Sequence, residues 1–432
     1  MALVAVFVLN ESSLIAQKHA VGENDYRTWK KISSKRISDD GSVVSYMTEP
    51  LLGDAYQYLH QSKTNRLDSF ARGGSLSLTQ DNRFAIFKIS PGYDTIRSLK
   101  LEKVKKSKWP KDSLGIYDLS PNTLIKEPNL YSYQVAEEGN TLAYVQQEQI
   151  EPKGGLFAFL FASKEAKKES RHVLKVYGSY PILSFRHDDV KKFTLSPDGS
   201  RIAYIESVED KEKQLSEKMV VRSTVNGQQI VSFPLIQKYK VPIWSASSEK
   251  MAFFFSNDTT HNNYELKVYD FTLSASLSFG DTLDPNLDRE SVPSQWRTPF
   301  FSEDEERLFF GVHQRAYEEA EDSLLKEEKA RLDVWHYKDD RIQPQQLKQL
   351  KRDEKKNHLY VYNFRQAKLI QLSDDTLTVL VSNKYEPDYA LAYSREPYQV
   401  ESQWSYPWMR DYYRISINSG ADTLVKRGLK YP

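Results

Sequence analysis

The sequence predicts an all-β fold of the β-propeller class, with about six to seven four-stranded blades and short helical insertions. A ten-residue pattern recurs seven times along the 432 residues. Its copies start 41 to 71 residues apart, which leaves room for about four short strands and their loops, the size of one blade. The 27 Tyr and 20 Phe residues also favour β-structure, because aromatic side chains pack well on a pleated surface.

The clearest copy of the pattern is Leu195-Ser-Pro-Asp-Gly-Ser-Arg-Ile-Ala-Tyr204. The first and eighth positions are apolar in every copy, and the second is Ser or Thr in six of the seven. The other copies start at Ile37, Leu78, Val135, Trp244, Phe301 and Leu372.

Each copy is interpreted as an apolar anchor, a tight turn and a buried strand. The eighth and tenth residues are two apart and therefore share one face of a strand. Asp198-Gly199 in the middle of the copy suits a chain reversal, because Asp bonds nearby backbone groups and Gly tolerates positive φ. The Ser or Thr before the turn can bond backbone N–H groups as well. The last three copies lose the Gly, so the pattern is degenerate there.

Further strand-like pieces lie between the copies. A single blade cannot bury both of its faces, so successive blades are expected to stack around an axis and cover one another. A sandwich or a barrel would explain the alternation of apolar residues but not the long-period repeat. The predicted strands include Leu114–Leu119, Leu266–Asp270, Leu359–Asn363, Tyr413–Ile417 and Thr423–Val425.

Three stretches break the pattern and are interpreted as insertions between strands. Gln314–Arg331 is rich in Glu, Lys, Ala and Leu and predicts a charged surface helix. Gln343–His358 predicts a solvated loop or a second helix, and Glu151–Arg171 mixes an apolar piece with a charged run.

Residues 1–20 are predicted to form a signal peptide, and residues 21–432 the propeller. Eight apolar residues follow Met1 and Ala16 offers a small residue for cleavage, although no Lys or Arg precedes the apolar run. The alternative is a buried first strand. A signal peptide implies a periplasmic or secreted protein. The chain stops at Pro432 with no polar tail or helix, and we expect it to be truncated at its C-terminal end.

Composition excludes several classes of function. Lys plus Arg is 60 and Asp plus Glu is 59, which argues against a nucleic-acid binder and a polybasic membrane-surface protein. No apolar run reaches the ~18–20 residues that span a bilayer. The absence of Cys excludes disulfides, thiolate metal sites and a Cys nucleophile.

No motif for catalysis, cofactor binding or metal binding was found, so we predict no catalytic residue, no cofactor and no metal site. There is no Gly-x-Ser-x-Gly elbow, no P-loop and no Gly-x-Gly-x-x-Gly, and Gly73-Gly74-Ser75 and Gly178-Ser179 read as turns. The eight His residues lack metal-ligand spacing. His187-Asp188-Asp189 is interpreted as a loop, and the acidic pairs at Asp39, Asp339 and Asp374 mainly as turn chemistry.

Aromatic residues near the C-terminus allow two interpretations. They suit a ligand funnel, because aromatic loops often anchor ligands, and they also suit packing between blades, which is the interpretation we favour. The residues are Trp404, Tyr406, Trp408, Tyr412 and Tyr413.

Three stretches resemble the propeller of serine peptidases of the prolyl oligopeptidase family. They are Trp29–Ile32 leading into Ile37–Tyr46, Pro110–Leu119, and Leu332–Gln346. The resemblance implies a propeller of the dipeptidyl-peptidase and TolB-like kind, followed by an α/β-hydrolase domain with a Ser-Asp-His triad that cleaves peptides. The hydrolase domain is missing from this chain, so no triad residue carries over.

The sequence therefore predicts the non-catalytic propeller portion of a secreted or periplasmic peptidase. Its expected partners are the missing C-terminal hydrolase domain and the peptide substrates of the parent enzyme. Two alternatives stay open. One is a free-standing propeller that binds a protein partner. The other is a propeller glycosidase, which would need paired carboxylates about 5–9.5 Å apart across the funnel.

Overall fold

The computed structural model describes residues 22, 25, 29–149, 170–177, 186–209, 215–258, 263–280, 287, 289–316, 328, 332, 334–337, 339–381 and 388–431. The predicted signal peptide at residues 1–20 lies outside them, as do most of Glu151–Arg171 and Gln314–Arg331. None of the helices in these ranges is long and apolar enough to cross a membrane.

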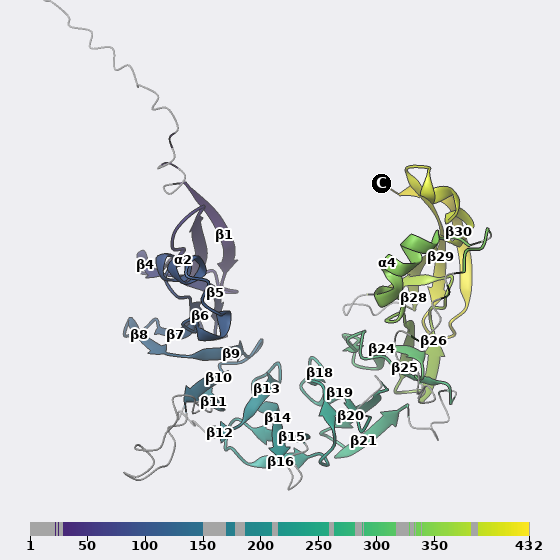
Figure 1. Cartoon of the computed structure of the whole chain (residues 1–432). Helices are drawn as coiled ribbons and strands as arrows, with labels where there is room; N and C mark the ends of the chain where they lie inside the picture. Colours follow the sequence, from purple (N-terminus) through teal and green to yellow (C-terminus); the bar gives the residue numbers. More distant parts are fainter. Residues whose placement is uncertain are drawn as a thin grey trace, which may run out of the picture. The chain divides into compact units, whose positions relative to one another are not determined.

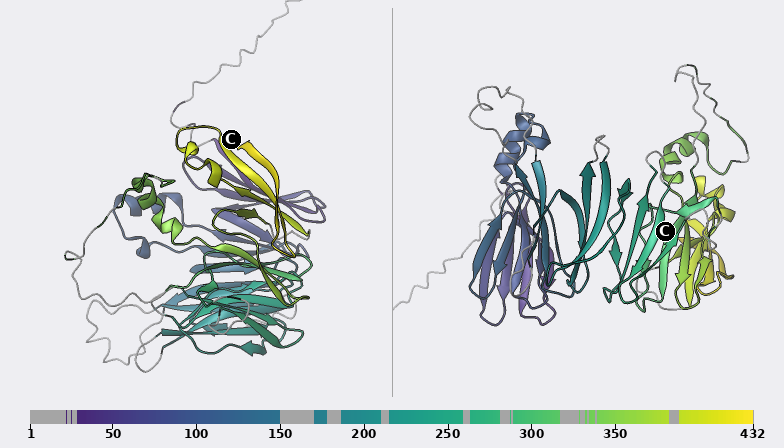
Figure 2. Two further views of the ribbon diagram at one scale, coloured as in Figure 1. Left: turned by 90° about the vertical axis from the view of Figure 1, so that its right-hand side faces the viewer. Right: turned by 90° about the horizontal axis from the view of Figure 1, so that it is seen from below.

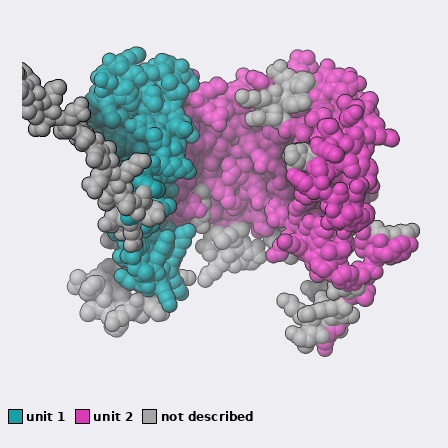
Figure 3. All heavy atoms as spheres, turned by 90° about the horizontal axis from the view of Figure 1, so that it is seen from above, with its two compact units in different colours: residues 1–78, 82–129 teal, residues 79–81, 130–432 magenta. Residues whose placement is uncertain are grey.

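The strands of the described ranges form seven successive antiparallel sheets of four or five strands, which we call blades 1 to 7 (Figure 1). This confirms the predicted all-β fold of the β-propeller class. The chain divides into two compact units, coloured separately in Figure 3: residues 1–78 with 82–129, and residues 79–81 with 130–432.

The first unit contains blades 1 and 2. Blade 1 consists of β1 (Lys30–Ile37), β2 (Val43–Pro50), β3 (Tyr56–Gln61) and β4 (Arg66–Ala71). Blade 2 consists of β5 (Gly73–Leu78), β6 (Phe84–Ile89), β7 (Ser113–Asp118) and β8 (Thr123–Glu127), with helix α2 (Tyr93–Leu101) and a short 3-10 helix, η1 (Lys106–Lys108), between β6 and β7. Buried Leu59 and Phe87 belong to one apolar cluster that joins the two blades.

The second unit contains blades 3 to 7. Blade 3 has β9 (Leu130–Val135), β10 (Leu142–Gln149), β11 (Ser170–Tyr177) and β12 (Arg186–Asp188), and blade 4 has β13 (Val190–Leu195), β14 (Arg201–Glu209), β15 (Leu215–Ser223) and β16 (Gln229–Ser232). In blades 5 and 6 the first strand is split into two pieces that both pair with the second strand. Blade 5 has β17 (Lys238–Tyr239), β18 (Ile243–Trp244), β19 (Lys250–Ser256), β20 (Glu265–Asp270) and β21 (Ala275–Phe279). Blade 6 has β22 (Ser291–Pro293), β23 (Phe300–Phe301), β24 (Arg307–Gln314), β25 (His358–Asn363) and β26 (Lys368–Gln371), with helix α4 (Gln343–Asp353) before β25. Blade 7 has β27 (Thr378–Leu380), β28 (Tyr389–Ser394), β29 (Trp408–Ser416) and β30 (Asp422–Tyr431), with 3-10 helices η2 (Glu396–Tyr398) and η3 (Glu401–Gln403) between β28 and β29.

Neighbouring blades of the second unit share apolar clusters, as stacking of the repeat predicts. Strand β14 shows this most clearly, because its residues alternate between two apolar clusters. Ile202 and Tyr204 pack with residues of blade 3, whereas Ala203 and Ile205 pack with residues of blade 5. Side chains two apart share a face of a strand, so one strand supplies both interfaces.

The turn of the repeat is closed by a side-chain network. The Ser196 hydroxyl donates to Asp198 Oδ1 at 2.5 Å and accepts the backbone N–H of Arg201 at 2.9 Å. Asp198 Oδ1 also accepts the backbone N–H of Ser200 at 3.0 Å, and Gly199 adopts a φ of 71°. The predicted chain reversal and the predicted role of the short hydroxyl residue are both confirmed.

The same network recurs where the sequence pattern is weaker. The Ser302 hydroxyl donates to Asp304 Oδ1 and accepts the backbone N–H of Arg307. Two non-glycine residues occupy the left-handed position in the degenerate copies, Ser248 with a φ of 65° and Glu305 with a φ of 56°. A non-glycine residue in the left-handed conformation lowers the free energy of unfolding by roughly 1–2 kcal/mol. The turn therefore forms without Gly, but it is less stable.

The seventh copy of the pattern does not occupy the equivalent place. In the first six copies the turn joins the first strand of a blade to the second, and the eighth residue lies in the second strand. The copy from Leu372 instead links β26 of blade 6 to β27 of blade 7. Ser373 accordingly accepts the backbone N–H of Leu359, a neighbouring strand residue, at 2.6 Å. The sequence match at Leu372 is therefore not a true copy of the turn.

Turns of adjacent blades are hydrogen-bonded to one another. In the first unit, Asn82 Nδ2 donates to Asp40 Oδ1 at 2.9 Å. In the second unit, such bonds link blade 3 to 4, 4 to 5, and 5 to 6. Examples run from Glu138 N to Pro197 O at 2.8 Å, from Asp198 N to Ser248 Oγ at 3.2 Å, and from Ser247 Oγ to Glu305 Oε2 at 2.7 Å.

The insertions share one place in the blade, the connection from the second strand to the third. Gln343–His358 contains helix α4, so the second of the two predicted alternatives is confirmed. Figure 2 shows this helix beyond the ends of the strands of its blade. Helix α4 therefore lies at the opposite end of strand β24 from the repeat turn of its blade.

We expect the Ser196→Ala substitution to lower the free energy of unfolding by about 1–3 kcal/mol, because it leaves buried polar groups of the turn without a partner. Urea denaturation would measure this loss. Ser276→Ala is the control, since Ser276 is exposed on strand β21. Equal effects of the two substitutions would show that the turn network does not stabilise the blade.

Two glycine substitutions separate backbone strain from crowding between blades. Gly41 and Gly199 both have positive φ, but a Cβ on Gly41 would meet nothing within 4 Å, whereas one on Gly199 would stand 2.9 Å from Ala136 Cβ in blade 3. Gly41→Ala should cost about 1–2 kcal/mol and Gly199→Ala about 2–4 kcal/mol, since only the second adds steric overlap. Urea midpoints of the two variants measure the difference, and a larger loss for Gly41→Ala would contradict this account.

The turn should also set the acid sensitivity of Asp40. Hydrogen bonds from Ser38 and then Ser42 lower the pKa of the Asp40 carboxyl from 3.8 to about 2. Because the folded pKa is lower than the unfolded one, the stability that Asp40 contributes is present above about pH 4 and is lost as the pH falls toward 2. In an NMR titration, Ser38→Ala should raise this pKa toward 3.8. Ser62→Ala should leave it unchanged, because the Ser62 hydroxyl donates to Gly41 O instead. An equal rise in both variants would argue against the assignment.

Candidate functional site

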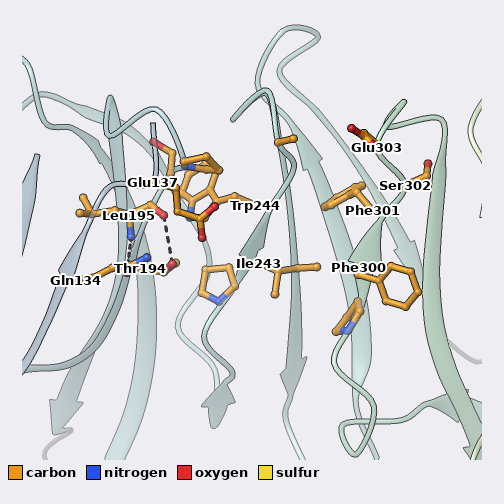
Figure 4. A pocket seen from close by; sticks show the side chains of 15 residues that line it. Gln134, Glu137, Thr194, Leu195, Ile243, Trp244, Phe300, Phe301, Ser302 and Glu303 are labelled. Carbon is orange, nitrogen blue, oxygen red and sulfur yellow. Dashed lines mark hydrogen bonds between the residues drawn. The ribbon is translucent and has the colours of Figure 1, made fainter. Parts of the chain in front are cut away.

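A cavity of about 490 Å³ lies at the ends of the first strands of blades 3 to 6, inside the second unit (Figure 4). Its volume falls in the range of about 300–1,000 Å³ that is usual for ligand pockets. All four blades contribute equivalent places of the ten-residue repeat.

The repeat explains which residues reach the cavity. First-position anchors line it in three blades, namely Leu195, Trp244 and Phe301. The third position holds a carboxylate in the two outer blades of the four, Glu137 in blade 3 and Glu303 in blade 6. In blades 4 and 5 the same position is Pro197 and Ala246. The same position of the repeat thus places a carboxylate in the cavity in two blades and an uncharged side chain in the other two.

The part of the cavity wall that lies between Glu137 and Glu303 is apolar, and two of its aromatic rings stack on rings behind them. The Trp244 ring stacks on Phe271 with centroids 5.5 Å apart, and the Phe300 ring stacks on Phe309 with centroids 4.9 Å apart. The Trp244 indole nitrogen is buried and has no hydrogen-bond partner in the described ranges. Pro242 precedes β18 and lines the same wall.

The carboxylates of Glu137 and Glu303 are exposed at opposite sides of the cavity (Figure 4). Neither forms a hydrogen bond or an ion pair with any other described residue through its side chain. Among the described lining residues they are the only ionisable ones, so the cavity carries negative charge and no compensating cation. Gln134 is held in place by accepting the backbone N–H of Leu195 at 3.0 Å.

The sequence analysis did not single out this cavity. The repeat predicted the anchors at positions one and eight as core residues, but the third position carried no constant feature. The variation at that position was the available signal, since acidic residues occur there at Asp39, Glu137 and Glu303 but not in the other copies of the turn.

The His187 cluster is structural, and its interpretation as a loop was wrong. His187 and Asp188 lie in strand β12, and only Asp189 connects it to β13. Burial lowers the pKa of His187, and its ring lies 4.8 Å from that of Tyr204. The Asp188 carboxylate forms an ion pair with Arg171 on the adjacent strand β11, at 2.6 Å.

The remaining polar candidates serve local structure. Gly73 to Ser75 form a strand rather than a turn, with a register shift after Gly74 in strand β5. Gly178-Ser179 lies outside the described residues. The acidic pairs are not brought together: Asp40 and Asp374 each accept backbone N–H groups of their own turns. No group of three or more His, Asp or Glu residues in the described ranges could hold a metal ion.

The C-terminal aromatic residues divide between the two predicted roles. Trp404 and Tyr406 are 73% and 72% exposed, so the favoured interpretation as packing between blades was wrong for them. Tyr413 packs against the cluster that joins blades 6 and 7, as that interpretation expected. Trp408 is partly exposed, and the ring of Tyr412 lies near that of Tyr393.

Trp404 and Tyr406 belong to a larger apolar surface. The connection that contains α4 and the connection between β28 and β29 are joined by a hydrogen bond from Gln403 Nε2 to Asp340 O at 2.6 Å. Both carry exposed apolar side chains, and together these form what we call the insertion surface: Leu332, Val334, Trp335, Tyr337, Ile342, Leu347, Leu350, Trp404 and Tyr406. Large exposed apolar side chains are typical of surfaces that bind another protein or domain.

No protein-family model and no curated protein sequence matches the chain. Several solved structures are similar in fold. Acylaminoacyl peptidase from Pyrococcus horikoshii is 8% identical, with a TM-score of 0.36 over 93% of this chain and 53% of that one. The β-propeller domain of the trilobed protease from Pyrococcus furiosus is 8% identical, with a TM-score of 0.37 over 93% and 100% of the two chains.

A eukaryotic initiation factor is 11% identical, with a TM-score of 0.43 over 92% of this chain and 78% of that one. The chain spans about half the length of the acylaminoacyl peptidase. β-Propeller portions of prolyl oligopeptidase-family peptidases are thus among its structural neighbours, beside proteins of other functions. At such low identity and TM-score, this likeness concerns the β-propeller fold alone.

Proposed function

We propose that the chain is the non-catalytic β-propeller portion of a secreted or periplasmic serine peptidase of the prolyl oligopeptidase type. Its role is to hold the hydrolase domain and to restrict which peptides reach it. The insertion surface is the observation that carries this proposal. It presents large apolar side chains to solvent at one end of blades 6 and 7, where a second domain would bury them.

Two features of the sequence support the same role. The chain lacks a Gly-x-Ser-x-Gly elbow, which exposes the nucleophile in α/β-hydrolases. One of the three stretches that resemble the peptidase family, Leu332–Gln346, contributes to the insertion surface. The resemblance and the exposed surface therefore point to the same part of the chain.

The purified 432-residue chain should show no turnover of fluorogenic peptides, because it supplies no activated nucleophile. The product of the complete reading frame should cleave them, and the codons after Pro432 should encode a Gly-x-Ser-x-Gly elbow. Turnover by the 432-residue chain that a serine-directed inhibitor abolishes would refute a non-catalytic role. A stop codon directly after Pro432, with no hydrolase gene beside it, would refute the domain assignment.

The test can also identify the alternative role. A free-standing propeller would use the same insertion surface to bind a separate protein. Trp404→Ser and Tyr406→Ser should then weaken that complex, whereas in the peptidase they should loosen the contact between domains and raise susceptibility to limited proteolysis. Ser276→Ala, on an exposed strand away from this surface, is the matched control.

A further inference from the structure

The cavity at the first strands of blades 3 to 6 has no part in the proposed function, which places the hydrolase at the insertion surface. In blade 6, the repeat turn and helix α4 of the insertion surface's connection lie at opposite ends of strand β24. Residues of the repeat line the cavity. It is therefore a separate feature, and its chemistry can be considered on its own.

The charge of the cavity selects for a cation. Glu137 and Glu303 are exposed and have no partner among the described residues, and none of the described lining residues is basic. A carboxylate forms its strongest hydrogen bonds with charged donors, such as an ammonium or a guanidinium group. The two carboxylates lie on opposite sides of the cavity, so a ligand that pairs with both must extend across it (Figure 4).

The wall between the carboxylates selects for apolar groups. Trp244, Phe300 and Phe301 present aromatic surface there, and Pro242 and Pro299 precede the two short strands that carry them. Stacking on Phe271 and Phe309 fixes two of these rings before any ligand arrives. A preformed aromatic wall lowers the cost of ordering on binding.

We propose that this cavity binds an extended segment of a partner protein that has a basic residue at each end and apolar residues between them. The basic residues pair with Glu137 and Glu303, and the apolar residues cover the aromatic wall. A free polyamine would supply both charges but no apolar body, so it fits only the carboxylates. This inference does not rest on the proposed peptidase role, because the bound segment is not a substrate for cleavage.

The test is calorimetric titration of the 432-residue chain with a series of N-acetylated, C-amidated peptides. Each peptide has an arginine at both ends and two, three or four leucines between them. The spacer is varied because each extended residue adds ~3.3 Å. The best of these should bind, and Glu137→Gln or Glu303→Gln should each weaken it about tenfold, since each removes one charge-assisted hydrogen bond. The peptide should be recovered uncleaved.

Matched controls separate the site from general electrostatics. Glu138→Gln removes the same charge one residue away, outside the cavity lining, and should leave the affinity unchanged. Replacing both arginines of the peptide by glutamine should weaken binding about a hundredfold, in line with two lost charge-assisted bonds. Circular dichroism should be the same for all variants, because the substituted carboxylates are exposed.

Several results would overturn the proposal. Absence of binding by every spacer length up to millimolar concentration would do so, as would equal affinity for the arginine and glutamine peptides. Equal losses of peptide affinity for Glu137→Gln and Glu138→Gln would show that binding depends on the net charge of the protein and not on the cavity. Binding of spermidine as tight as that of the best peptide would rule out the apolar contribution, and with it the peptide as the occupant.

Discussion

The hydrogen-bonded turn between the first and second strands of a blade is the constraint on which the rest of the structure depends. Its Ser and Asp side chains saturate backbone groups that a tight reversal would otherwise leave unpaired, as Ser196 and Asp198 show. The same turn bonds to the turn of the next blade, for example from Asp198 N to Ser248 Oγ. One local interaction thus shapes the blade and also sets its position beside its neighbour.

This constraint explains why the core alternates so regularly. Once the turn fixes where the second strand begins, the eighth and tenth residues must face one neighbouring blade and the ninth must face the other. In β14 these are Ile202 and Tyr204 on one side and Ala203 on the other. A shift of the turn by one residue would exchange the two faces.

The sequence was sufficient to predict the features that this repeat controls. The fold class, the reversal at Asp198-Gly199 and strands such as β20 and β25 all follow from local chemistry and period-two alternation. Features set by contacts between distant segments were not accessible. Helix α2 was missed because it is short and has no buried residue to create an apolar period. The Leu372 match was misassigned because its apolar and polar spacing also fits a link between blades. The cavity was missed because its lining comes from four copies that are close only in the folded chain.

The repeat also explains how a binding cavity can arise without a catalytic motif. Positions one, two, four and five are held by packing and by the turn, whereas the third position lines the cavity in all four blades and varies between Glu137, Pro197, Ala246 and Glu303. A residue under no structural demand can change its chemistry at little cost in stability. Because the fold carries this position to the same end of every first strand, independent changes in different blades converge on one cavity. The functional chemistry of such a protein should therefore be sought at the repeat positions that vary, since those that recur are already committed to the fold.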